Sequence, residues 1–278
     1  MIKFTKKLDD PDGRVSKLIF EDETAIAESV VFKYQDRGVI CFSVQSGCRV
    51  GCRFCGTGGK FVRNLEPYEM INQIQEGLKL IKDKEKIQLM SMSMGEPMDN
   101  WSRVKSVVDS YFSYQFFIST VGLRNYQALH DFLTYGSRFK GFGLQFSLHS
   151  VDEKKRFKML GSHESLLRIK DIKDYADFWN LVTDKPVYYN FICTGEETKE
   201  DARKLVDIVG EKNHLTLSVL CKTYPKTPAD RESLFRFEDF VVSAGIKNWS
   251  LFDPDGQDTI GGGCGQLWYV QDKLRKKV

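Results

Sequence analysis

The sequence predicts an α/β protein built as a partial, open (β/α)6 barrel with a short N-terminal antiparallel β extension. From Val39 onward, apolar strand-like runs alternate with helical stretches, and this alternation implies a parallel sheet. The 278 residues are enough to bury one large core. Residues 1–37 differ, because their short segments alternate polar and apolar side chains with the period of two that is typical of antiparallel strands.

The elements follow in order along two predicted domains, an N-terminal β extension at 1–37 and a catalytic domain at 38–278. The extension holds two strand-like segments, Val15–Glu21 and Ser29–Tyr34, separated by turn residues. In the barrel we predict strands at Val39–Val44, Ile87–Ser93, Gln115–Thr120, Gly143–His149, Val187–Cys193, Leu215–Cys221 and Asn248–Phe252. Between them we predict helices at Pro67–Lys82, Trp101–Ser113, Leu123–Tyr135, Glu164–Phe178, Lys199–Lys212 and Phe235–Ala244.

Composition limits the class of protein. A charged content of 28% and a net charge of +3 describe an ordinary globular chain. The apolar runs are too short to span a bilayer, and the N-terminus lacks a signal-peptide core, so we expect a cytoplasmic location. Seven cysteines, without the dense pairing of a secreted scaffold, fit reduced thiols. Basic runs such as Lys154–Lys158 permit a nucleic-acid partner without demonstrating one.

Three cysteines, Cys48, Cys52 and Cys55, follow the first barrel strand at spacing C-x3-C-x2-C. In (β/α) barrels the active site lies at the C-terminal ends of the strands, and this loop follows the end of the first one. Thiolates are the usual ligands of iron–sulfur clusters, and three of them leave one iron open. A zinc site would need a fourth Cys or His, and the nearest histidine is His130. We therefore predict an iron–sulfur cluster, although three unrelated buried cysteines are the alternative. The spacing is the hallmark of the radical-SAM superfamily, in which the open iron binds S-adenosylmethionine.

Three further stretches lie at the ends of the next strands. Met94–Pro97 forms a turn in which Glu96 offers a carboxylate to an ammonium group. Ser119–Gly122 supplies hydroxyls and a glycine for close approach, and Ser147–His149 ends the fourth strand. Each stretch is a weak signal alone, since G-E-P is a common turn and a lone histidine is more often structural. Their order on successive strands is the stronger signal.

With Phe61–Leu65 and Gly263–Leu267, these stretches make the chain from about residue 25 to residue 268 resemble the radical-SAM RNA methyltransferases. That family modifies adenosine in large-subunit ribosomal RNA and in tRNA, at adenine carbon 2 or, in a relative that confers antibiotic resistance, at carbon 8. The resemblance implies a barrel of radical-SAM type, a [4Fe–4S] cluster on the three cysteines and S-adenosylmethionine. Its cofactor site would contain Gly95, Glu96, Ser119, Ser147, Leu148 and His149.

The resemblance also implies a mechanism. Cys264 matches the family's methyl-carrying cysteine, Cys41 its resolving cysteine and Glu28 its proton acceptor. Cys264 would take a methyl group from one S-adenosylmethionine, and a radical made from a second would couple that carbon to the base. Cys41 would then release the product by forming a disulfide with Cys264. A reductant such as flavodoxin, an RNA substrate and a monomeric state are implied too.

Taken alone, the same residues have plainer interpretations. Cys41 would be a buried strand residue and Glu28 a surface charge, while Cys193 and Cys221 fit core thiols. Asp253, Asp255 and Asp258 could mimic a metal loop, although a solvated turn fits them better.

The sequence departs from the family at two places. Lys222 stands near the family's Asn ligand for the cofactor, and only 47 residues precede Cys48, so the family's helical accessory domain is expected to be missing. Substrate choice could therefore differ, and tRNA fits as well as ribosomal RNA.

Two other functions stay open. One is another radical-SAM enzyme, such as a glycyl-radical activating enzyme, which would not need Cys41 or Cys264. The other is a non-catalytic RNA-binding or metal-storing homologue. The sequence does not identify the RNA, the position on the base or the electron donor.

Overall fold

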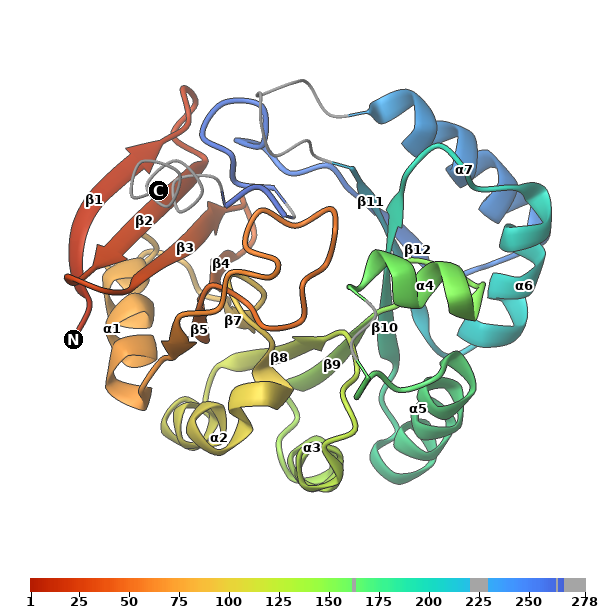
Figure 1. Cartoon of the computed structure of the whole chain (residues 1–278), viewed down its shortest axis with the longest axis horizontal. Coiled ribbons are helices and arrows are strands. Elements are labelled where there is room, and N and C mark those ends of the chain that lie inside the picture. The colour runs from red at the N-terminus through yellow and green to blue at the C-terminus, as the bar shows by residue number, and fades with distance from the viewer. Residues whose placement is uncertain (162–163, 221–229, 264, 268–278) are drawn as a thin grey trace.

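The computed structural model describes residues 1–161, 164–220, 230–263 and 265–267, and one ten-stranded sheet runs through them (Figure 1). The strand order is β1-β2-β3-β4-β7-β8-β9-β10-β11-β12. The bounds are β1 (Lys3–Asp9), β2 (Val15–Glu21), β3 (Ile26–Lys33), β4 (Gly38–Cys41), β7 (Ile87–Ser91), β8 (Gln115–Thr120), β9 (Phe142–Ser147), β10 (Val187–Cys193), β11 (His214–Val219) and β12 (Trp249–Phe252). A separate two-stranded ladder joins β5 (Gln45–Ser46) to β6 (Arg63–Asn64).

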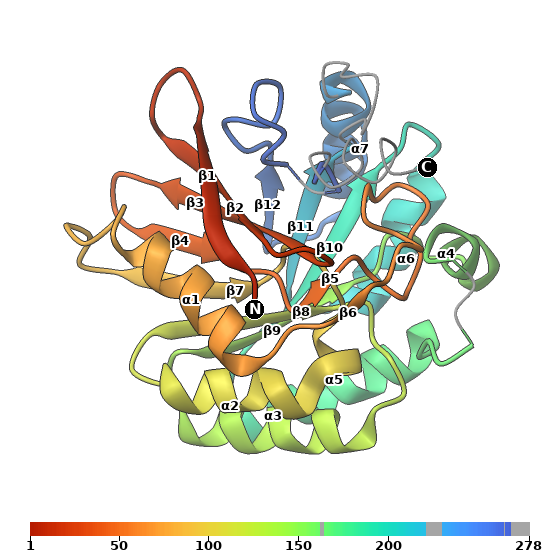
Figure 2. The same cartoon turned by 60° about the vertical axis from the view of Figure 1, so that its left-hand side comes forward.

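The strands from β4 to β12 in this sheet pair in parallel, and helices connect them. In Figures 1 and 2 most of these helices lie along the outside of the curved sheet. They are α1 (Pro67–Leu78), the 3₁₀ turn η1 (Pro97–Asn100), α2 (Trp101–Ser110), α3 (Tyr126–Arg138), α4 (Glu153–Met159), α5 (Ile169–Thr183), α6 (Lys199–Val209) and α7 (Arg231–Ala244). In the described part of the chain β1 and β12 end the sheet without pairing, so the predicted open α/β barrel is confirmed.

The N-terminal strands β1 to β3 form an antiparallel extension that continues the barrel sheet. β3 pairs antiparallel with β4, so there is no break in the hydrogen-bonded sheet between the two predicted domains. The division at residue 37 stays a prediction. The sequence did not indicate β1, because its side chains are almost all polar and exposed and therefore lack an apolar alternation.

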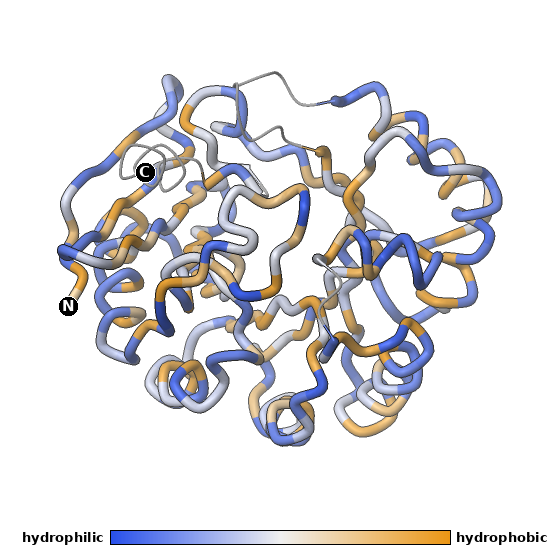
Figure 3. Tube along the Cα trace, viewed as in Figure 1, coloured by the Kyte–Doolittle hydropathy of each residue, from blue (hydrophilic) through white to orange (hydrophobic). Residues whose placement is uncertain are grey.

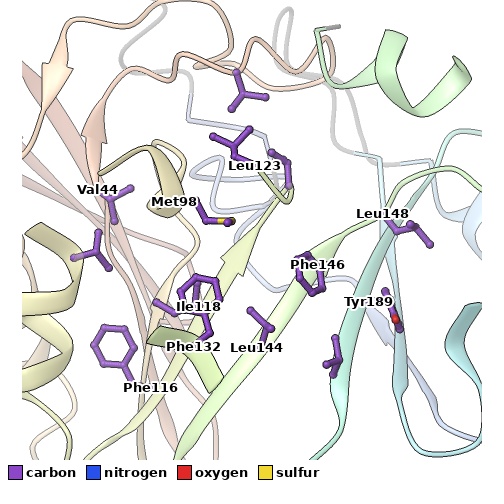
Figure 4. Packing of buried hydrophobic residues seen from close by; sticks show 14 of the residues in the cluster. Val44, Met98, Phe116, Ile118, Leu123, Phe132, Leu144, Phe146, Leu148 and Tyr189 are labelled. Carbon is purple, nitrogen blue, oxygen red and sulfur yellow. The ribbon is translucent and has the colours of Figure 1, made fainter. Parts of the chain in front are cut away.

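The main hydrophobic core lies between the sheet and the outer helices. Figure 4 shows Phe116 and Ile118 of β8 and Leu144 and Phe146 of β9 next to Phe132 of α3. Apolar residues follow the strands in Figure 3 and alternate with polar residues along the helices, as amphipathic packing requires. No helix in the described residues is long and apolar enough to cross a membrane.

The concave inner face of the barrel carries both polar and apolar side chains. A pocket of about 450 Å³ that Cys41 lines lies there, with amide and hydroxyl groups of the strands beside apolar residues such as Phe117 and Leu251. Asn190 and Ser218 are joined by a hydrogen bond of 2.6 Å across β10 and β11.

We expect Trp179→Ala on α5 to lower the free energy of unfolding by about 3–5 kcal/mol, because this indole is fully buried and its loss leaves a cavity. Leu181→Ala on the same helix is the matched control, since Leu181 is 80% exposed and should change stability by less than about 0.5 kcal/mol. Denaturant unfolding of both variants checks this, and equal losses would contradict the assigned packing.

Candidate cluster and cofactor site

The cysteine loop runs from β5 to β6 above the C-terminal ends of the parallel strands (Figure 1). Gly47 begins it with a positive φ of 74°, and a Cβ at this position would lie 1.6 Å from the carbonyl oxygen of Lys60. Only glycine fits such a close approach of two backbones. The Val62 N–H donates to the carbonyl of Ser46, which closes the loop at its base.

One pocket of about 110 Å³ brings most of the predicted site residues together. Among the predicted cluster and cofactor residues, Leu148 is the exception, because its side chain is fully buried in the main core and does not line the pocket. The pocket also takes in Phe54 and Thr57 of the cysteine loop and Ser91, Ser93 and Val121 at the strand ends, which the sequence did not single out. The predicted residues that line it are Cys48, Cys52, Cys55, Gly95, Glu96, Ser119, Ser147 and His149.

The three cysteines suit a cluster better than a single metal ion. Burial, reinforced by the nearby Cys55 thiol, raises the pKa of Cys48 to about 12, so a thiolate there needs a bound cation to compensate it. Among the described residues, no three His, Cys, Asp or Glu side chains converge as ligands of one ion. An iron–sulfur cluster binds its thiolates through separate irons, so its ligands need not converge on one point.

Glu96 fixes the pocket wall. Its carboxylate accepts hydrogen bonds from the Met98 N–H at 2.9 Å, the Val121 N–H at 2.9 Å and the Thr120 hydroxyl at 2.5 Å. Burial raises the pKa of Glu96 to about 7 despite these donors. We expected this carboxylate to face an ammonium group, and the structure instead joins it to η1 and to the end of β8. Its contact with a cofactor therefore stays a prediction.

His149 joins the fourth strand end to the cysteine loop. Its backbone has a positive φ of 59°, and its Nδ1 accepts a hydrogen bond from the Ile192 N–H at 3.2 Å. The ring packs edge-on against Phe54, with 5.0 Å between the ring centroids. Burial and the neighbouring Arg156 guanidinium lower the pKa of His149 to about 3, so the imidazole is neutral.

Cys41 lines a second pocket, of about 70 Å³, together with Cys55 and the glycines Gly262, Gly263 and Gly265. The Gly56 N–H donates to the Gly265 carbonyl at 2.7 Å, which ties the C-terminal segment to the cysteine loop. Cys264 lies outside the described residues, as do Cys221 and Lys222. No disulfide joins two of the described cysteines, so the predicted disulfide is not shown.

Glu28 is buried, so its interpretation as a surface charge was wrong. Its carboxylate pairs with the Lys17 ammonium at 2.8 Å, and both side chains are 0% exposed. Sequence reasoning missed Lys17. No local pattern signalled it, because β2 carries buried apolar side chains on both faces and only the pairing of β2 with β3 brings Lys17 beside Glu28.

Comparison with known proteins identifies the family. Residues 42–212 match the profile of the radical SAM superfamily. The chain is 31% identical to a probable dual-specificity RNA methyltransferase RlmN of Dictyoglomus turgidum, over 94% of this chain and 78% of that one. The chain belongs to the radical SAM superfamily, within its RlmN family. The superfamily implies a [4Fe–4S] cluster and S-adenosylmethionine, so both predicted cofactors are confirmed.

One further relative and two solved structures are also similar to this chain. A dual-specificity RNA methyltransferase RlmN of Sulfurimonas denitrificans is 26% identical over 96% of this chain and 81% of its own length. A crystal structure of a radical SAM methyltransferase from Sphaerobacter thermophilus has the same fold, with a TM-score of 0.81 at 24% identity over 95% of this chain and 80% of that one. Streptococcus suis SuiB bound to S-adenosylmethionine is more distant, with a TM-score of 0.54 at 15% identity over 77% of this chain and 47% of that one.

The lowered pKa of His149 predicts an acid-sensitive fold. The unfolded chain binds a proton at an ordinary pKa of 6.5, while the folded chain resists it down to about 3. The stability that depends on neutral His149 is therefore complete above pH 6.5 and is lost as the pH falls toward 3. Between about pH 7.5 and about pH 5.5, wild type should lose about 1 kcal/mol more unfolding free energy than His149→Gln.

Denaturant unfolding at both pH values measures this difference. His130→Gln is the control, since His130 is exposed on α3 and its replacement should leave the wild-type pH dependence intact. If His149→Gln loses as much unfolding free energy as wild type between these two pH values, the assignment of a neutral buried imidazole to His149 is wrong.

Proposed function

We propose that this protein is a radical-SAM RNA methyltransferase that methylates an adenosine carbon through a methyl-cysteine at Cys264. The observation that carries the proposal is that the Cys41 pocket and the cluster pocket adjoin, because Cys55, Met92, Ser93 and Gly265 line both. The chain neighbours of Cys264, Gly263 and Gly265, line the Cys41 pocket. The relatives named as RNA methyltransferases support the substrate class.

Methylation of an adenine carbon needs unusual chemistry. The carbon is not a nucleophile, and its C–H bond is not acidic enough for a side-chain base to remove the proton. In the proposal Cys48, Cys52 and Cys55 hold the cluster. Together with S-adenosylmethionine, the cluster supplies the one-electron chemistry that opens an inert C–H bond. The cofactor would lie against the strand-end residues Gly95, Glu96, Ser119, Ser147 and His149, with Leu148 contributing through its backbone.

The protein's own groups carry out the remaining steps. The Cys264 thiolate attacks the methyl carbon of S-adenosylmethionine, so that a new sulfur–carbon bond forms while the bond from the methyl carbon to the sulfonium sulfur breaks and the thioether S-adenosylhomocysteine leaves. Glu28 accepts the proton that the adenine carbon loses once the base is tied to Cys264. The Cys41 thiolate then attacks the Cys264 sulfur: a disulfide forms, the bond to the product carbon breaks, and that carbon takes up a proton.

The RNA would be ribosomal RNA or tRNA, presented as an unpaired or flipped adenosine, because a duplex buries the base edge. A reductant such as flavodoxin and a monomeric enzyme complete the proposal. The relatives named above favour this function over the two alternatives, a glycyl-radical activating enzyme and a non-catalytic homologue.

We expect Cys264→Ala to abolish RNA methylation and Cys41→Ala to accumulate a covalent RNA–protein adduct. The first variant lacks the sulfur that carries the methyl group, and the second lacks the thiol that releases the product. Anaerobic reconstitution of the cluster, followed by mass spectrometry of the protein and of the digested RNA, measures both. Wild type should carry an S-methyl group on Cys264.

The matched control is Cys193→Ala, because Cys193 is fully buried on β10 away from both pockets and burial raises its thiol pKa. This variant should keep RNA methylation near the wild-type level. Cys264→Ala that still methylates RNA at the wild-type rate would refute the methyl-cysteine route.

A further inference from the structure

The ion pair between Lys17 and Glu28 has no evident structural purpose. The two charged atoms lie 2.8 Å apart, and neither side chain is exposed at all. Within the described residues, this pair is the only polar contact recorded for the Lys17 ammonium.

Apolar side chains surround the pair. Desolvating two charges in such surroundings costs about as much as their attraction returns, so well-packed apolar residues would stabilise the fold at least as well. Stability therefore does not account for the pair. The cluster on this side of the sheet consists of Val15, Ile19, Ile26, Val30, Phe32, Val39, Cys41, Met94, Ile260 and Leu267.

The register of the sheet places the pair beside the proposed chemistry. Val30 of β3 stands directly opposite Cys41 of β4, and Glu28 lies two residues from Val30 on the same face. Val15 lies two residues from Lys17 on β2, and a Cβ at Gly262 would contact both Val15 and Val30. The segment that leads to Cys264 therefore packs over the face that carries Lys17, Glu28 and Cys41.

We propose that Lys17 is a positioning residue whose ammonium holds the buried Glu28 carboxylate in the orientation in which it accepts the proton from the base. The inference rests on the proposed function. An acceptor carboxylate must be held within hydrogen-bond reach of the proton that it takes, and the 2.8 Å contact with Lys17 fixes one Glu28 oxygen. In the step itself the C–H bond of the tethered base breaks, its electron pair stays in the ring, and the proton binds a Glu28 oxygen. The unpaired electron left by the radical coupling would return to the oxidised cluster of the proposed function, and Lys17 takes no part in the transfer.

The test compares Lys17→Met with Glu28→Gln in the reconstituted enzyme. Both should lower RNA methylation by about 100-fold or more, the usual contribution of a general base. Both should still carry the S-methyl group on Cys264 and should accumulate the covalent RNA–protein adduct, because only the proton transfer is blocked. The double variant should be no slower than Glu28→Gln, and Lys17→Arg, which keeps the charge, should recover part of the activity.

Lys185→Met is the matched control. Lys185 is a half-buried lysine that donates to the carbonyls of Gly136, Phe139 and Phe142, far along the strands from the pockets. Its loss should lower stability without accumulating adduct. If Lys17→Met does not fold, Lys17→Gln, which keeps a hydrogen-bond donor without the charge, is measured in the same way.

The outcomes separate the two proposals. Wild type that methylates neither Cys264 nor RNA refutes the proposed function. A second outcome refutes only the role of Lys17. In it wild type is active and Glu28→Gln accumulates the adduct, but the folded Lys17 variant methylates RNA at the normal rate. A Lys17 variant that loses Cys264 methylation in step with RNA methylation also refutes it, because a general structural defect would then explain the loss.

Discussion

Parallel pairing from β4 to β12 is the constraint on which the site depends. Strands in parallel register end at the same edge, so segments far apart in sequence arrive side by side there. The cysteine loop after β4, the turn after β7 and the ends of β8 and β9 meet in one pocket for this reason. Buried polar side chains then fix the loops. Glu96 joins the turn after β7 to β8, and Arg156 of α4 donates to the carbonyls of Val121 and Leu167.

The C-terminal segment, residues 260–263 and 265–267, joins the two pockets. Gly265 contacts the cysteine loop through its carbonyl, while Ile260 and Leu267 pack into the apolar cluster that contains Cys41. The segment therefore packs against the strands at the start of the chain, and the two pockets share part of their lining instead of lying in separate places. In the proposed function this arrangement sets sulfur and carboxylate groups beside the site of radical formation.

Strong local patterns were predictable from the sequence and long-range partners were not. The bounds of β8 and β10 match the predicted Gln115–Thr120 and Val187–Cys193, because both are short apolar runs between clear turns. The predicted Glu164–Phe178 helix is displaced, since α5 runs from Ile169 to Thr183 and ends at Asp184 in the left-handed conformation. Helix α4 was missed because its seven residues are mostly charged. Cysteine spacing identified the pocket, whereas no local pattern shows that Glu28 is buried against Lys17.

The exposed lysines of β1 have a consequence for assembly. β1 forms the outer edge of the sheet in the described chain, and an unpaired edge offers a row of backbone donors and acceptors to any extended peptide. Lys3, Lys6 and Lys7 project from this edge strand into solvent, and the register with β2 is irregular between Phe4 and Lys6. Charge and irregularity together disfavour strand addition by a second copy, which protects the protein from aggregating through its own sheet.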